Sequence, residues 1–165
     1  MELDRARPEE YDAVYGMGFD VWGEGLEFDA FIGHCRESPK YARGRWFVAR
    51  EGTEPVSSLL VHDFDAWEGD PVRGIGSLAT QVDRRRTGAG GALLDHVPRL
   101  LISEEKAGVV FLYSDIDRSY YEKRGFQVLA EPHQRYQPSV AMACFSPTRD
   151  MSFVERNADR LPSYF

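Results

Sequence analysis

The chain has 165 residues, of which 42% are hydrophobic and 28% are charged. This length and composition are typical of one globular domain with its own core, so we expect a single domain over residues 1–165. The formal net charge of −7 argues against a general nucleic-acid binder, which is usually basic. An acidic chain is compatible with a cationic substrate such as an amine, although the charge can equally serve solubility.

Neither a membrane segment nor a metal site is expected. The sequence has no run of about 18 apolar residues, which a membrane span would need, and its charged N-terminus lacks the apolar core of a signal peptide. Cys35 and Cys144 are the two cysteines, and their separation, like the scattered histidines, gives no metal-ligand spacing. We expect two free, buried thiols in a reducing cytoplasm.

The first third of the chain predicts one strand and two helices. The strand covers residues 2–6. Pro8 and the acids that follow it indicate the start of a helix, and apolar residues at helical spacing extend to Trp22. A second short helix is expected over residues 28–35, and Ser38-Pro39 ends it.

A hairpin and a further strand come next. Residues 46–49 and 56–62 are apolar strands on either side of a Glu-Gly turn, which predicts a hairpin. We expect the mostly polar residues 63–70 to form a loop. The strand after this loop is predicted over residues 74–82.

The central helix contains a proline. The apolar pattern predicts a helix over residues 90–106, with Pro98 inside it. Because a proline within a helix costs about 3 kcal/mol or forces a kink, we expect a bend near His96 or a break there. The continuous apolar run at residues 108–113 predicts a buried strand.

The remainder of the chain predicts a short helix that ends at Lys123 and then two strands, over residues 126–129 and 139–145. The tail, residues 146–165, is not placed, apart from a short helix near residues 151–157 that covers an edge. Strands that alternate with helices in this order indicate a mixed α/β protein.

The stretch from Arg84 to Leu94 joins the strand at 74–82 to the central helix. Its glycines allow the backbone to approach a ligand, and the free amides of a helix start point at an anion. No lysine follows Gly90 or Gly91, as a Walker loop requires, and Leu93 stands where a dinucleotide fingerprint requires a glycine. The stretch predicts a phosphate-binding turn of another kind, the alternative being a helix start without a ligand.

Two motifs resemble the signatures of the GCN5-related N-acetyltransferase (GNAT) superfamily. The first, Arg85-Arg86-Thr87-Gly88-Ala89-Gly90, is similar to the pattern Arg/Gln-x-x-Gly-x-Gly/Ala of that family's coenzyme A pyrophosphate loop. The second, Tyr120-Tyr121-Glu122-Lys123-Arg124-Gly125-Phe126, has a tyrosine ahead of a Gly-Phe pair, as the family does. The order and separation of the motifs also suit the family, and the resemblance covers roughly residues 45–144.

The resemblance implies a fold and a cofactor. The expected fold is α/β (α+β), with a central mixed, mostly antiparallel sheet of six to seven strands and helices on both faces. The strands at 74–82 and 109–113 should splay apart to admit the pantetheine arm of acetyl-CoA, which gives a cofactor-binding core at about residues 72–128.

The family's use of the loop implies which residues hold acetyl-CoA. The strand before the loop contributes backbone groups, and the loop contributes amides and positive charge. The predicted residues are Leu78, Ala79, Thr80, Arg85, Arg86, Thr87, Gly88, Ala89, Gly90 and Gly91. Val82 replaces the proline that the family usually has near the strand end, which affects loop stiffness more than phosphate binding.

Acyl transfer to an amine needs an acid for the leaving thiolate and a route for the amine proton. By resemblance the acid is Tyr121, a phenol that is protonated at neutral pH, the alternative being that its ring only packs the sheet. Asp115, at the end of the buried strand, is the predicted base. Other candidates are Ser114, Glu24, Glu27, His62 and Asp63, and a chain of waters can replace a dedicated base.

We therefore expect an acetyl-CoA-dependent N-acetyltransferase that acts on a primary amine of a small molecule. Trp22, Glu24, Glu27 and Trp67 are the predicted acceptor-site residues. The alternatives are a protein or peptide amine as acceptor, a longer acyl group, or a non-catalytic acyl-CoA-binding module. No nucleic-acid or membrane partner is expected, and the tail leaves formation of a homodimer open.

Overall fold

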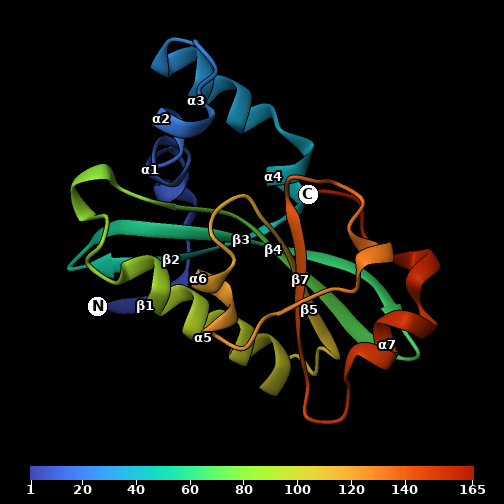
Figure 1. Ribbon diagram of the computed structural model, residues 1–165. Coiled ribbons are helices and arrows are strands. Elements are labelled where there is room, and N and C mark those ends of the chain that lie inside the picture. Colours follow the sequence, from blue (N-terminus) through green and yellow to red (C-terminus); the bar gives the residue numbers. More distant parts are fainter. The chain divides into compact units, whose positions relative to one another are not determined.

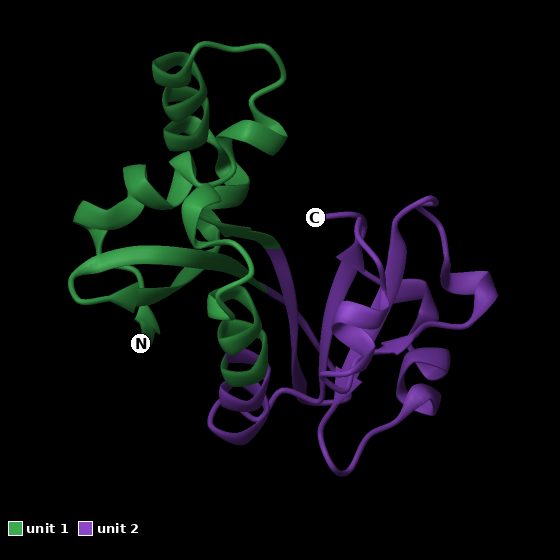
Figure 2. Ribbon diagram, turned by 60° about the vertical axis from the view of Figure 1, so that its left-hand side comes forward, with its two compact units in different colours: residues 1–62, 77–96 green, residues 63–76, 97–165 purple.

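A computed structural model describes residues 1–165, and the chain forms two compact units (Figure 2). Unit 1 consists of residues 1–62 and 77–96, and unit 2 consists of residues 63–76 and 97–165. The chain passes between them within strands β3 and β4 and within helix α5.

The strands of unit 1 form an antiparallel ribbon (Figure 1). Strand β1 (Glu2–Arg5) pairs with β2 (Arg45–Glu51), and β2 pairs with the first part of β3 (Glu54–Trp67). The β2–β3 register runs from Arg45↔Val61 to Glu51↔Glu54. The predicted first strand and the predicted hairpin are thus confirmed.

Short helices pack against this ribbon and replace the longer helix that the apolar spacing up to Trp22 indicated. The helical segments of unit 1 before β2 are η1 (Pro8–Glu10), α1 (Tyr11–Gly16), α2 (Phe19–Trp22), α3 (Phe28–Glu37) and α4 (Pro39–Arg43). Helix α4 was not expected, because Ser38-Pro39 ends α3 but also caps a new helix at its N-terminus: the Ser38 hydroxyl accepts from the Tyr41 amide. The core of the unit contains Val14, Tyr15, Phe31, Ile32, Cys35, Trp46, Val48 and Leu60.

A buried ion pair ties the first helical turn to the ribbon. The Arg50 side chain on β2 is 1% exposed, and its Nε and Nη2 donate to Glu10 Oε1 and Oε2 at 2.6 and 2.8 Å. The same Nη2 donates to the Arg5 carbonyl at 2.9 Å. These bonds satisfy a charge that would otherwise be costly to bury.

Unit 2 holds the remaining strands. The first part of β4 (Asp70–Thr80) pairs in parallel with β5 (Val109–Ser114), from Val72↔Val109 to Gly74↔Phe111. Strand β7 (Val140–Phe145) pairs antiparallel with β5 and with the short β6 (Gln127–Val128). The hydrogen-bonded order of the strands is β1-β2-β3-β4-β5-β7-β6, which confirms the predicted mixed, mostly antiparallel sheet.

The loop predicted at residues 63–70 is wrong. Strand β3 continues to Trp67, a two-residue turn at Glu68-Gly69 follows, and β4 begins at Asp70. Both turn residues have positive φ, 51° and 87°, as the type I′ turns of twisted hairpins require. The acidic residues that suggested a loop are the exposed positions of a strand whose Trp67 is buried.

Helix α5 (Ala89–Ser103) keeps Pro98 inside it, which confirms the predicted helix. Of the bend or break expected near His96, the break does not occur. The other helical segments after β4 are η2 (Val82–Arg84), α6 (Ser119–Glu122), η3 (Glu131–His133), α7 (Met151–Arg156) and η4 (Ala158–Arg160). The predicted tail helix is confirmed as α7, and Asp150 caps it by accepting from the Ser152 amide at 2.9 Å. No helix combines the length and hydropathy that a membrane span requires.

The core of unit 2 lies between the strands and α7. It contains Trp67, Val72, Val109, Phe111, Leu129, Ala141, Ala143, Phe153 and Val154. Trp67 packs edge-on against Phe111 and Phe153, with ring centroids 5.4 and 5.6 Å away. The two cysteines are free and buried.

The ion pair predicts a pH-dependent stability. The hydrogen bonds from Arg50 lower the pKa of the Glu10 carboxyl from 4.5 to about 2. Since the folded-state pKa is the lower one, the contribution, about 3 kcal/mol, is present above pH 4.5 and is lost as the pH falls toward 2. Glu10→Gln should lower the urea-derived free energy of unfolding at pH 7 by about this amount and flatten its decline below pH 5.

Glu9→Gln is the matched control, because Glu9 is exposed and such surface changes usually alter stability by less than about 0.5 kcal/mol. Equal unfolding midpoints for the Glu10 variant and the wild type at pH 7 would contradict the role of the pair.

Candidate functional site

The glycine turn of unit 1 has the geometry of an anion site. After η2, Arg86 and Gly88 both have positive φ, 64° and 97°, and α5 begins at Ala89. Thr87 Oγ1 donates to the Arg84 carbonyl at 2.7 Å, which closes the turn. Alternating left-handed residues direct successive amides to one side and form the nest that binds phosphate in many proteins.

The first amides of α5 have no acceptor in the protein. The hydrogen bonds of the helix begin with the Ala92 amide, which donates to the Gly88 carbonyl at 2.9 Å. The amides of Ala89, Gly90 and Gly91 precede this bond, and these three residues are buried. Buried donors without an acceptor are costly, and an anion at the positive end of the helix would satisfy them.

The three arginines of the motif differ in their partners. Arg84 bonds with Glu51 and Asp83 at 3.2 and 2.8 Å. The Arg85 guanidinium bonds bidentately with the Asp20 carboxylate, each N···O distance being 2.8 Å, and donates from Nε to the Thr80 carbonyl at 3.2 Å.

Arg86 is exposed and has no hydrogen bond or ion pair within the protein. Of the three side chains, it is the one that is available to a phosphate. Arg85 was predicted to contact the cofactor, but its side chain is already bonded to α2 and the end of β4, so it braces the loop. The hydrogen bonds from Arg85 also lower the pKa of Asp20, which keeps the pair charged.

The end of β4 offers backbone groups on one side only. The Ala79 carbonyl accepts from Ser57 Oγ at 2.9 Å, and the Gln81 amide donates to the Val56 carbonyl at 2.9 Å. Because backbone groups alternate sides along a strand, those of Leu78 and Thr80 point away from β3. These two fit the predicted contacts with a pantetheine arm, whereas Ala79 does not.

The predicted acceptor residues fall in different environments. Trp22, Glu24 and Glu27 are exposed and lie close in sequence in unit 1: Trp22 is the last residue of α2, and the two glutamates lie between α2 and α3. Glu24 has a φ of 47° and starts the turn into α3. Trp67 is 2% exposed in the core of unit 2, so the expectation that its ring lines an acceptor site does not fit, because a solute cannot reach it.

Tyr121 on α6 is a buried phenol in unit 2. It is 9% exposed, and its ring packs edge-on against Tyr120 and Phe126 at centroid distances of 5.4 and 6.2 Å. No protein group forms a hydrogen bond with its hydroxyl. Burial raises the pKa of Tyr121 to about 12, and the nearby Tyr120 and Asp115 add to the shift. The phenol is therefore protonated throughout the physiological range.

Asp115, just after β5, accepts hydrogen bonds from two hydroxyl groups. Ser139 Oγ donates to Oδ1, and the Tyr164 hydroxyl donates to Oδ2 at 2.6 Å. Neither partner was foreseen, since Tyr164 lies 49 positions further along the chain and no local pattern signals the contact. Among the other candidate bases, Ser114 Oγ is bonded to the Ile116 carbonyl and Asp63 is paired with Arg73.

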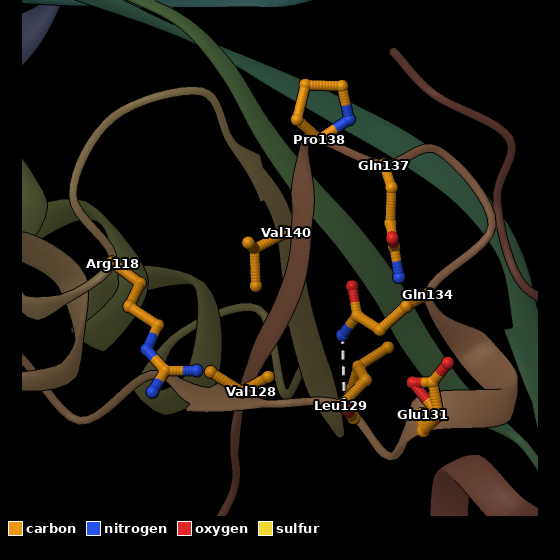
Figure 3. A pocket seen from close by; sticks show the side chains of 8 residues that line it. All are labelled: Arg118, Val128, Leu129, Glu131, Gln134, Gln137, Pro138 and Val140. Carbon is orange, nitrogen blue, oxygen red and sulfur yellow. Dashed lines mark hydrogen bonds between the residues drawn. The ribbon is translucent and has the colours of Figure 1, made fainter.

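A pocket lies beside β6 and β7 (Figure 3). Its volume is 460 Å³, and it is lined by Arg118, Val128, Leu129, Glu131, Gln134, Gln137, Pro138 and Val140. The Gln134 amide is committed to structure: it bonds to the Leu129 carbonyl, as Figure 3 shows, and to the Ala141 carbonyl and amide. This wall therefore continues the sheet where β6 ends.

The comparisons with known proteins agree with the fold. The sequence model for "Acetyltransferase (GNAT) domain" matches residues 42–128, just over half of the 165-residue chain. Comparison with curated protein sequences finds no significant match.

Three solved structures illustrate the likeness. An aminoglycoside 6'-N-acetyltransferase complexed with coenzyme A is 15% identical at a TM-score of 0.63, with 91% of this chain and 100% of that chain covered. The "histone acetyltransferase HPA2 and related acetyltransferase" of Corynebacterium glutamicum is 19% identical at 0.65, with 90% and 97% covered. A conserved protein from Enterococcus faecalis is 14% identical at 0.62, with 78% of this chain but only 32% of that one covered.

Identities this low show a shared fold, whereas the sequence match identifies the family. The chain belongs to the GNAT acetyltransferase family.

Proposed function

We propose that the protein is an acetyl-CoA-dependent N-acetyltransferase that acts on a primary amine of a small molecule. Family membership supports the transferase class. The observation that carries the proposal is the turn at Arg86–Gly88, where three buried amides without acceptors lie beside an arginine without a partner.

The residues of this turn fit the pyrophosphate of coenzyme A. The amides of Ala89, Gly90 and Gly91 would donate to its oxygens, and Arg86 would supply the positive charge. At Gly88 a Cβ would meet no atom within 4 Å, so the backbone there is open to a ligand. Leu78 and Thr80 would offer backbone groups to the pantetheine arm.

Acetyl-CoA supplies an acetyl thioester, so that the amine nitrogen forms the new C–N bond while the C–S bond breaks and the thiol leaves. Tyr121 is our candidate acid. Its hydroxyl is protonated at neutral pH as in any phenol, burial raises its pKa further, and it has no protein acceptor that would compete for that proton. Its Oη–H donates a hydrogen bond to the departing sulfur as the C–S bond breaks, and the thiolate then takes its proton from solvent.

Asp115 is our candidate for receiving the proton that the amine loses. Its two hydroxyl partners occupy two of about four acceptor positions on the carboxylate. The remaining positions can accept a hydrogen bond from an ammonium group of the acceptor, or from a water that lies between the carboxylate and the ammonium group. The exposed Trp22, Glu24 and Glu27 of unit 1 stay candidate acceptor-site residues.

The free, buried thiols fit a reducing compartment such as the cytoplasm. Tyr164 and Phe165 of the tail contact Tyr113 of their own unit, but Tyr164 is 49% exposed, so a homodimer through the tail stays a prediction. A peptide amine as acceptor and a non-catalytic acyl-CoA-binding module are the competing outcomes of the tests below.

Cofactor binding should depend on Arg86 and much less on Arg84. Arg86→Ala removes the unpaired guanidinium and should weaken acetyl-CoA binding about tenfold or more, since a hydrogen bond to a charged group contributes about 1.5–3 kcal/mol. Arg84→Ala is the matched control, because Arg84 already has two acidic partners. Isothermal titration calorimetry gives both dissociation constants. If wild-type protein does not bind acetyl-CoA, the proposed function fails.

Turnover should depend on the Tyr121 hydroxyl. Tyr121→Phe keeps the ring packing and removes the proton donor, so we expect kcat to fall about 100-fold or more with an unchanged dissociation constant for acetyl-CoA. Thiol release in the presence of a panel of small amines and a lysine peptide measures the effect. Tyr120→Phe, the adjacent ring, is the control and should retain activity. Full activity of the Tyr121 variant would assign the tyrosine to packing alone.

A further inference from the structure

The segment at residues 161–165 lies on the end of β5 in unit 2. The Tyr113 hydroxyl donates to the Pro162 carbonyl at 2.6 Å. The Tyr113 ring also contacts the rings of Tyr164 and Phe165, each at a centroid distance of 5.4 Å. Phe165 in turn packs on Phe64 of β3 at 5.1 Å. The segment is thus held both by a hydrogen bond and by ring contacts.

These contacts bring one polar atom of the segment onto a candidate catalytic group. The Tyr164 side chain is 49% exposed, yet its hydroxyl points at Asp115 and donates to Oδ2. Ser139, which precedes β7, donates to Oδ1. Two donors on opposite oxygens fix the rotation of a carboxylate that would otherwise turn freely at an exposed position.

We propose that Tyr164 is a positioning residue: it holds Asp115 in the orientation in which the carboxylate receives the ammonium group of the acceptor. This inference rests on the proposed function. It adds a part of the chain outside both family motifs to the acceptor site, and it assigns a positively charged amine to that site.

A purely structural role for Tyr164 makes different predictions. If the residue only anchors the segment, its ring should matter and its hydroxyl should not. A loosened segment would also impair folding or cofactor binding as much as it impairs use of the amine. The substitution Tyr164→Phe separates these roles, because it removes one oxygen atom and keeps the ring.

The experiment compares Tyr164→Phe with Tyr136→Phe. The Tyr136 ring contacts those of Tyr113 and Tyr164 at 5.4 and 6.2 Å, but its hydroxyl has no partner in the protein. Steady-state thiol release gives KM for the amine and kcat, and calorimetry gives the acetyl-CoA dissociation constant. We expect Tyr164→Phe to raise KM for the amine about tenfold, the loss of one charge-assisted hydrogen bond, with acetyl-CoA binding unchanged. Tyr136→Phe should leave all three within about twofold.

A double-mutant cycle tests whether Tyr164 acts through Asp115. In an Asp115→Ala background, Tyr164→Phe should add little, because the two residues form one unit. Ser139→Ala, which frees the other carboxylate oxygen, should raise KM in the same direction. It keeps the test decisive if thermal unfolding shows that Tyr164→Phe does not fold.

The outcomes separate the inference from the function on which it rests. An active wild type with an unchanged Tyr164→Phe variant, additive effects in the cycle, or an equal loss of acetyl-CoA binding overturns the positioning role alone. A wild-type protein that binds acetyl-CoA but neither binds nor acetylates any amine of the panel overturns both the amine acetyltransferase function and this inference.

Discussion

The need to satisfy three backbone amides at the start of α5 organises the rest of the candidate site. Ala89, Gly90 and Gly91 precede the first hydrogen bond of the helix and are buried, so their donors require an acceptor from outside the protein. The positive φ angles of Arg86 and Gly88 turn the backbone of the loop and so decide where these amides point. A side chain at Gly88 would be strained by its φ of 97° even though no atom stands in its way. Gly88 is therefore required by the backbone conformation and not by a lack of room for a side chain.

The loop holds this shape because neighbouring elements bind its first arginines. Arg84 is tied to β2 through Glu51, and Arg85 is tied to α2 through Asp20 and to β4 through Thr80. Only Arg86 is left for an anion. The arginines of this candidate phosphate site therefore have two uses: Arg84 and Arg85 shape the loop, and Arg86 is available to a ligand. An acidic residue can therefore lie beside an anion site when it pairs with an arginine that holds the loop in shape and does not bind the anion.

Local sequence patterns predicted the fold well where one signal dominated. The apolar run ending at Tyr113 became β5, and the Glu-Gly turn became a hairpin. Prediction failed where signals competed. At residues 63–70 a polar composition masked a strand with its acids outward. Pro98 lies inside the helix, as predicted, and does not break it, because the helix is buried on both sides of the proline, at Val97 and Leu101. Burial of the flanking residues outweighs the lost hydrogen bond in such a case.

The candidate site, like the fold, could be predicted only in part from local sequence. The glycine turn is continuous in sequence, so its amides and arginines could be recognised as a motif. Which arginine is unpaired could not, because Asp20 and Glu51 are distant in the chain. The burial of Trp67 and the bond from Tyr164 to Asp115 likewise depend on tertiary packing, over 49 positions in the second case. Composition marks Trp67 as large and apolar but does not say which side of a strand it occupies.

The burial of Tyr121 has two opposed consequences for the chemistry. A pKa raised to about 12 keeps the phenol protonated, but it also makes complete transfer to a thiolate of pKa about 8.5 unfavourable by about 5 kcal/mol. A hydrogen bond from the phenol to sulfur faces no such cost and strengthens as negative charge develops there, most of all in a site without water. In the proposed mechanism Tyr121 would therefore act chiefly as a hydrogen-bond donor while the C–S bond breaks. In the same proposal the amine releases one proton for each proton that the thiolate takes up, and the carboxylate of Asp115 would accept the proton that the amine releases.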